Sequence, residues 1–202
     1  MNLHPQDWIP HRPPFLFVDE VLSLEERSLV ARKTFEATLE IYRGHYPEHP
    51  VTPGAILCEA MFQAAGILVS YNHHRRNPSS ERNPSSGPSP DRPVFSRTDV
   101  PVLSRIEEAR FHRPVFPNET VEMRLTWEET MGRFFCFRGL MSCRGKRVLS
   151  LRFILAHISL GEEAAGWLSM PPASGPLRGP QGTNGSRHWS PAKPASSSPA
   201  HH

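Results

Sequence analysis

The stretch that decides the fold is TPGAILCEAMFQAAGILVSY, residues 52–71. Thr52 suits the N-cap of a helix, Pro53 suits its first position, and good helix-forming residues follow. A helix from Pro53 to Tyr71 would be about 28 Å long. Because the segment is apolar on nearly every side, the helix is expected to lie buried inside the protein.

A transmembrane span is the alternative interpretation of the same stretch. Glu59 and Gln63 interrupt the apolar run, and the remaining core is short for a bilayer. The pattern therefore favours the core helix of a soluble protein, with no membrane span.

Strand-like segments lie on both sides of the predicted helix. Residues 15–22 and 28–40 precede it, and residues 102–111, 120–129, 134–143 and 146–160 follow it. Short turns at 131–133 and 144–146 join the last three segments, which predicts antiparallel pairing. One long apolar helix with about six strands predicts an α+β fold in which a curved antiparallel sheet wraps the helix.

Two segments differ in composition from the rest of the 202 residues. Of the 22 prolines, five lie between Pro78 and Pro93 and seven lie after Met170. We expect one domain over residues 1–160, interrupted by a mobile Pro/Ser/Arg-rich insertion at about 73–93. Residues 161–202 are expected to form a disordered tail.

Charge and cysteine content narrow the possible functions. The N-terminal segment lacks the apolar core of a secretory signal, and Cys58, Cys136 and Cys143 form no Cys-x-x-Cys pair, so a reducing cytoplasm is expected. The formal charge of +3 favours an acidic partner only weakly. Basic and aromatic residues do not interleave along one stripe, so we predict no nucleic-acid surface.

The segment before the helix, GHYPEHPVTPG at residues 44–54, contains a His-x-x-Glu-His spacing that resembles a reversed zinc-protease motif. Zinc proteases present two such histidines from one face of a helix. Pro47 falls between His45 and His49, and Pro50 follows, so this segment is not expected to be helical. We predict no metal site here. A loop whose histidines are merely exposed remains an alternative.

Acid–base chemistry is the other interpretation of this region. Burial disfavours the charged form of a carboxyl, so Glu59 could donate a proton while a neutral His45 accepts one. Unpaired amides at the helix N-terminus, near Gly54, could stabilise a carbonyl that develops negative charge. Gln63 lies one turn from Glu59 and could orient it or a water molecule. Purely structural roles for Glu59 and Gln63 remain alternatives.

Three segments resemble, in order, motifs of the FabZ-type 3-hydroxyacyl-acyl-carrier-protein dehydratases. They are IPHRPPFLFVDEV (9–21), GHYPEHPVTPGAILCEAMFQAAG (44–66) and RIEEARFHRPVFPNETV (105–121). The resemblance covers about residues 8–158. It implies the hotdog fold, in which an antiparallel sheet wraps a long central helix. It also implies a homodimer, often assembled as a trimer of dimers, with active sites at the dimer interface.

The same resemblance implies roles for three residues. His45 matches the catalytic histidine and Glu59 the catalytic acid, each from a different subunit, and the Gly54 amide is expected to bind the thioester carbonyl of the substrate. Gln63, from its spacing to Glu59, is also expected to take part in binding substrate. The implied reaction is dehydration of a (3R)-hydroxyacyl thioester, carried by acyl carrier protein, to a trans-2-enoyl thioester in fatty-acid or related synthesis. Related dehydratases that also isomerise the double bond carry Asp at the acid position, so Glu59 points away from isomerisation. No cofactor or metal is implied.

Several residues depart from the family pattern. Glu48 stands where Gly is usual, Tyr46 replaces a common Phe, and Thr52 replaces a larger apolar residue. Phe62 replaces a small residue, and FPNET at 116–120 stands in for a Pro-Gly-Asp turn. These departures leave open the acyl chain length and the choice between acyl carrier protein and coenzyme A.

Two further functions are compatible with the same fold. A hotdog thioesterase would hydrolyse the thioester, but thioesterases place their carboxylate differently from Glu59. A non-catalytic protein that binds acyl carriers is the other alternative, and Glu48, Phe62 and the insertion keep it open.

Overall fold

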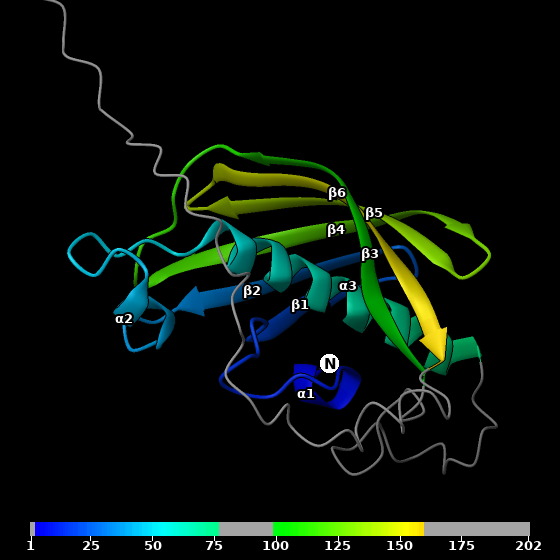
Figure 1. Cartoon of the computed structure of the whole chain (residues 1–202). Coiled ribbons are helices and arrows are strands. Elements are labelled where there is room, and N and C mark those ends of the chain that lie inside the picture. The colour runs from blue at the N-terminus through cyan, green and yellow to red at the C-terminus, as the bar shows by residue number, and fades with distance from the viewer. Residues whose placement is uncertain (1–2, 77–98, 160–202) are drawn as a thin grey trace, which may run out of the picture.

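The computed structural model describes residues 3–76 and 99–159. The predicted tail, and the insertion from residue 77 onward, lie outside the described residues. The elements, shown in Figure 1, are α1 (Pro5–Trp8), β1 (Glu20–Leu24), β2 (Ser28–Phe35), α2 (Ile41–Gly44), α3 (Gly54–Arg76), β3 (Asp99–Phe111), β4 (Glu119–Met131), β5 (Phe134–Cys143) and β6 (Lys146–Ser159).

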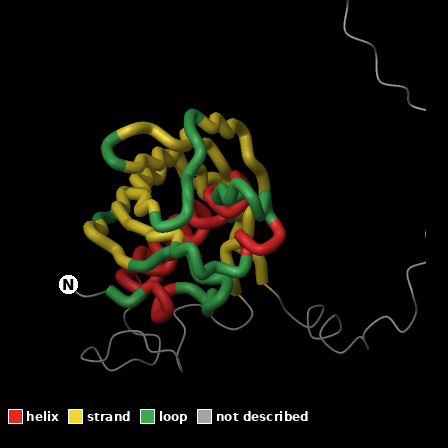
Figure 2. Tube along the Cα trace, turned by 90° about the vertical axis from the view of Figure 1, so that its left-hand side faces the viewer, coloured by secondary structure: helices red, strands yellow, loops and turns green. Residues whose placement is uncertain are grey.

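The six strands form one sheet in the order β1-β2-β4-β5-β6-β3, and every neighbouring pair is antiparallel. The sheet curves around α3, as Figure 1 and the turned view of Figure 2 show. Gly132 and Gly145, both at positive φ, form the turns that bracket β5. The expected α+β architecture, with an antiparallel sheet wrapped around a long helix, is confirmed.

Helix α3 is buried on several sides. Ala60, Met61, Ala64 and Leu68 are fully inaccessible to solvent. The helix begins one residue later than predicted and continues five residues beyond Tyr71, to Arg76. It is long and apolar enough to cross a membrane, but two thirds of its most apolar window (67%) is buried within the fold. This burial favours the core-helix interpretation.

The sheet presents alternate side chains to the helix. On β4, Val121, Met123 and Leu125 are buried, whereas the intervening Arg124 and Thr126 are exposed. Burial of each such large apolar side chain contributes about 1.5–3 kcal/mol. The concave face of the sheet and α3 therefore share one hydrophobic core.

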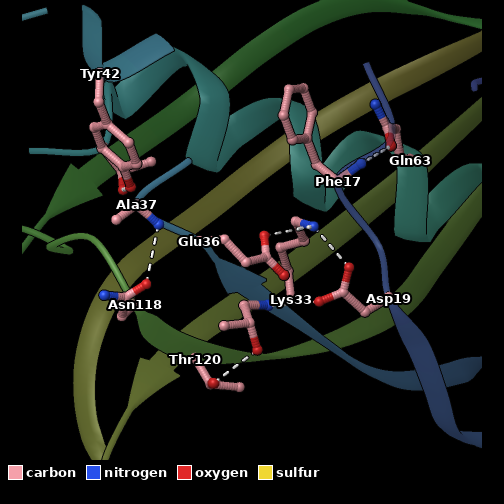
Figure 3. A network of polar contacts seen from close by, with 11 residues as sticks. Phe17, Asp19, Lys33, Glu36, Ala37, Tyr42, Gln63, Asn118 and Thr120 are labelled. Atoms are coloured by element: carbon pink, nitrogen blue, oxygen red, sulfur yellow. Dashed lines mark hydrogen bonds and ion pairs between the residues drawn. The ribbon is translucent and has the colours of Figure 1, made fainter. Parts of the chain in front are cut away.

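The first strand begins later than predicted, at Glu20 rather than residue 15. The Phe17 amide donates a hydrogen bond to Gln63 Oε1 on α3 (2.8 Å), as Figure 3 shows. Asp19 accepts hydrogen bonds from Lys33 Nζ and the Thr34 amide on β2 (2.6 and 2.7 Å). The Asp19 amide also donates to the Arg32 carbonyl on β2 (2.9 Å), beside the first ladder pair of β1, Glu20 with Arg32. Residues 15–18 precede this ladder, and Phe15 and Phe17 bond instead to the Gln63 side chain.

The second strand ends at Phe35, short of the predicted residue 40. Asn118 explains where the chain turns, because its amide donates to the Phe35 carbonyl (2.7 Å) and its Oδ1 accepts from the Ala37 amide (3.0 Å). Asn118 has a φ of 64°, a conformation that Asn tolerates better than most residues. The FPNET segment thus forms its turn with Asn118.

Strand β3 forms one edge of the sheet, and its residues 103–111 are all exposed. Among them, Leu103 and Ile106 are each 42% exposed, and Phe111 is 53% exposed. A long edge strand with exposed apolar side chains is a template for pairing with another chain.

Candidate active site

His45 lies on a non-helical loop between α2 and α3. Its Nδ1 is 2.9 Å from the Val51 carbonyl oxygen. Because a carbonyl only accepts hydrogen bonds, Nδ1 must carry the proton, and the lone pair of the neutral ring lies on Nε2. The loop therefore presents His45 with Nε2 able to act as a base.

A buried hydrogen bond joins Tyr42 and Thr52, which lie on either side of this loop. The Tyr42 and Thr52 hydroxyl oxygens are 2.6 Å apart. Thr52 is also held by its amide, which donates to the Val115 carbonyl (2.8 Å). The Thr52 hydroxyl thus bonds to Tyr42, and this contact fixes the spacing of the segment that carries His45.

The apparent zinc motif has no helical geometry. His49 follows a turn in which its amide donates to the Tyr46 carbonyl (2.9 Å), and Tyr46 has a φ of 51°. His45 and His49 are therefore not one helical turn apart. Within residues 3–76 and 99–159, no group of three or more His, Cys, Asp or Glu side chains is arranged to hold a metal ion.

Glu59 and Gln63 meet on one face of α3. Gln63 Nε2 donates to Glu59 Oε1 (2.9 Å) and to the Phe15 carbonyl (3.1 Å), while Gln63 Oε1 accepts from the Phe17 amide. Gln63 is only 1% exposed. The backbone of Phe15 and Phe17 therefore holds the Gln63 amide, and one N–H of that amide points at Glu59.

Glu59 faces a cavity of about 530 Å³. The remaining lining is mainly apolar and includes Ile9, Phe62, Val102 and Leu155. The Glu59 side chain is 24% exposed, so the carboxyl is not fully buried as the apolar helix had suggested. A carboxyl in the wall of an apolar cavity can bind a polar group of a ligand whose apolar chain fills the cavity.

Phe62 lines this cavity. It lies one helical turn from Glu59 and packs edge-on against Phe153, with ring centroids 4.9 Å apart. Gly66, one further turn along, is packed against Ile9, because a Cβ there would lie 3.3 Å from Ile9 Cγ2.

Gly54 has a packing role that the sequence did not indicate. A Cβ at Gly54 would lie 2.9 Å from the ring of Phe111 on β3. The space that glycine leaves is therefore occupied by Phe111. The Gly54 amide is still one of the first amides of α3, which have no partner within a helix.

The structure does not join all four predicted residues within one chain. Glu59 and Gln63 are hydrogen-bonded, and Gly54 begins the same helix. Among the contacts of the described residues, His45 meets Val51 and Tyr46, and it is not part of the wall of the Glu59 cavity.

Sequence reasoning missed His11, whose Nε2 lies 3.5 Å from Glu59 Oε1. His11 also lines the Glu59 cavity. Burial lowers the pKa of His11; the Glu59 charge opposes this effect and the Arg12 charge adds to it. His11 lies in a loop without periodicity, and only its presence in the first quoted motif could have drawn attention to it.

Comparisons with known proteins identify the family of the chain. Residues 9–152 match the FabA-like domain family. The chain is 34% identical over 150 residues to "3-hydroxyacyl-[acyl-carrier-protein] dehydratase FabZ" from Klebsiella pneumoniae, covering 74% of this chain and 87% of that protein. The Escherichia coli O9:H4 protein of the same name is similar to the same extent.

A solved structure shows the same fold. The dehydratase heterocomplex ApeI:P from Xenorhabdus doucetiae has a chain with a TM-score of 0.60 and 15% identity, covering 84% of this chain and 100% of that one.

Proposed function

The chain belongs to the FabA-like family, and on that premise we propose that it dehydrates (3R)-hydroxyacyl thioesters on acyl carrier protein to trans-2-enoyl thioesters in fatty-acid or related acyl-chain synthesis. One observation carries the proposal: Glu59, held by Gln63, lies in the wall of an apolar cavity. The curated relatives named as FabZ dehydratases support the same reaction.

The side chains divide the work of elimination. His45 Nε2 takes the proton from C2, and its Nδ1–H remains bonded to the Val51 carbonyl. The Gly54 amide donates to the thioester oxygen, which stabilises the negative charge that develops there. Glu59 gives a proton to the 3-hydroxyl as the C3–O bond breaks. The C2=C3 bond forms, water leaves, and proton return from His45 to Glu59 through solvent restores both residues.

We further propose that a homodimer completes the site. Strand β3 has Phe111 beside Gly54 at one end and Val102 and Leu103 in the Glu59 cavity at the other. In a two-fold antiparallel pairing of β3 with its copy, opposite ends of the two strands meet. The partner's His45 loop would then approach this chain's Glu59. The exposed Ile106 would be covered at such an interface.

The same proposal assigns partner and compartment. Acyl carrier protein would deliver the substrate as a thioester, as the names of the curated relatives indicate for those proteins. We place the reaction in the cytoplasm. Cys58, Cys136 and Cys143 are all free thiols, which suits a reducing compartment.

Turnover tests the reaction. Purified protein would be given 3-hydroxyacyl-carrier substrates of several lengths, and again the corresponding coenzyme A thioesters, with enoyl formation followed by absorbance. Glu59→Gln and His45→Ala are each expected to lower kcat on the order of 100-fold or more. Full rates in both variants would contradict the assigned roles, and release of free thiol without enoyl formation would indicate a thioesterase.

Mixed dimers test the shared site. His45→Ala and Glu59→Gln subunits, each with its own affinity tag, would be co-expressed and the mixed dimer isolated. If His45 and Glu59 act from different subunits, one of the two sites keeps both residues and the mixed dimer shows about half the wild-type rate. A mixed dimer as inactive as its parents would place both residues in one subunit.

A further inference from the structure

His11 and Gln63 approach the same oxygen of Glu59. Gln63 Nε2 donates to Oε1 at 2.9 Å, and His11 Nε2 lies 3.5 Å from that Oε1. The second distance is longer than a well-formed hydrogen bond, but catalytic hydrogen bonds are often long before substrate binds. Both side chains therefore approach the same carboxyl oxygen, Oε1.

The surroundings of His11 favour one neutral tautomer. Its Nδ1 is buried and, among residues 3–76 and 99–159, has no hydrogen-bond partner. A buried lone pair without a partner is tolerated better than a buried N–H without one. The proton of the neutral ring therefore belongs on Nε2, which faces Glu59.

The charged groups that face His11 are Glu59 on α3 and Arg12 beside it in the chain. Burial of the ring lowers the pKa of His11, and this outweighs the opposing effect of the Glu59 charge. His11 is therefore neutral at neutral pH and acts as a donor of one N–H, not as a cation. Its ring is held in place by stacking on Phe15, with centroids 6.3 Å apart.

We propose that His11 is a positioning residue for Glu59: its Nε2–H and the Gln63 amide hold Oε1, so that Oε2 is the oxygen that carries the proton to the leaving hydroxyl. The inference rests on the proposed dehydration and goes beyond it, because it assigns one oxygen of the acid to each task. His11 itself neither gains nor loses a proton in the reaction.

Two substitutions of His11 distinguish the role of its N–H donor from the role of its aromatic ring. His11→Phe keeps an aromatic ring that can stack on Phe15 but has no N–H. His11→Gln places an amide N–H near the position of Nε2. For His11→Phe, kcat is expected to fall on the order of 10- to 100-fold with KM changed less than about threefold. His11→Gln is expected to recover most of kcat.

The pH profile distinguishes positioning from a structural role. An N–H donated to a carboxyl oxygen alters the acid–base balance of the site, so removing the donor should shift a limb of the kcat–pH profile. His11→Gln should keep that limb in place. His4→Phe, the same substitution away from the cavity, is the matched control and should alter neither kcat nor the profile.

NMR of the histidine ring nitrogens provides a readout that does not need turnover. The wild-type protein is expected to show His11 as the Nε2–H tautomer at pH 7, and the Nδ1–H tautomer would overturn the proposal even if the protein proved not to be a dehydratase. In an active wild type, equal losses in His11→Phe and His11→Gln, or a reduced melting temperature with unmoved pH limbs, would also overturn it. Loss of all turnover in the wild type would instead refute the proposed function.

Discussion

The hydrogen bond between Tyr42 and Thr52 leads to a quantitative prediction about the loop that carries His45. Both residues are buried, at 7% and 3% exposure, and their hydroxyl oxygens are 2.6 Å apart. Tyr42→Phe and Thr52→Val each remove one hydroxyl with little change in shape. Each single variant leaves the other hydroxyl buried without its partner.

The structure sets the expected magnitudes. A buried polar group that loses its partner costs about 1–3 kcal/mol, whereas replacing both partners by apolar groups of the same shape is nearly neutral. We expect each single variant to lower the free energy of unfolding by about 1–3 kcal/mol. The Tyr42→Phe/Thr52→Val double variant should lose about 1 kcal/mol or less, so that the two substitutions are coupled by more than about 1 kcal/mol.

Activity should follow the same pattern. The bond closes the loop of residues 43–51, and displacement of a catalytic group by about 1 Å can lower the rate on the order of 100-fold. We expect kcat/KM to fall about tenfold in each single variant and to recover in part in the double variant. Urea unfolding would give the free energies, and turnover of a 3-hydroxyacyl-carrier substrate would give kcat/KM.

An exposed hydroxyl pair is the matched control. Thr34 and Thr120 face each other across β2 and β4, with oxygens 2.8 Å apart; Thr120 is exposed, Thr34 is half-buried, and the bond between them is solvent-exposed. The cycle of Thr34→Val and Thr120→Val should show coupling below about 0.5 kcal/mol and no change in kcat/KM. If the effects of Tyr42→Phe and Thr52→Val are simply additive, the bond does not hold the loop and the reasoning is refuted.

Three further predictions concern pH, packing and substrate length. Burial opposes ionisation of Glu119, but hydrogen bonds from the Phe116 amide and Arg113 outweigh it and hold the Glu119 pKa below its ordinary value of 4.5. This stabilisation is present above pH 4.5 and is lost as pH falls through the lower native pKa. Glu119→Gln should therefore flatten the acid dependence of the urea midpoint. An unchanged dependence would show that ionised Glu119 does not stabilise the fold. Gly139→Ala should destabilise the fold by about 1–3 kcal/mol in urea unfolding, because its Cβ would overlap Met61, and an unchanged midpoint would show that Met61 moves aside freely. Phe62→Ala should raise kcat/KM for long acyl chains relative to short ones, and an unchanged ratio would show that Phe62 does not limit the cavity.

Most of the fold could be predicted because its signals are local. The strand predicted at 134–143 matches β5 at both ends, since Gly132 and Gly145 mark the turns on either side. The start of β1 could not be predicted in this way. Residues 15–19 have strand-like composition, but the Phe17 amide is bonded to Gln63, 46 positions away. A pattern of neighbouring residues does not contain that contact.

The candidate site divides in the same way. By itself the sequence determined the apolar helix, the pairing of Glu59 with Gln63 and the loop that keeps His45 off a helix, because helix period and proline geometry act over a few residues. Only the tertiary structure decided that His11 faces Glu59 and that Phe111 fills the space beside Gly54. These contacts join segments far apart in the chain, and they exist because the curved sheet and the first loop close around α3, which no local spacing specifies.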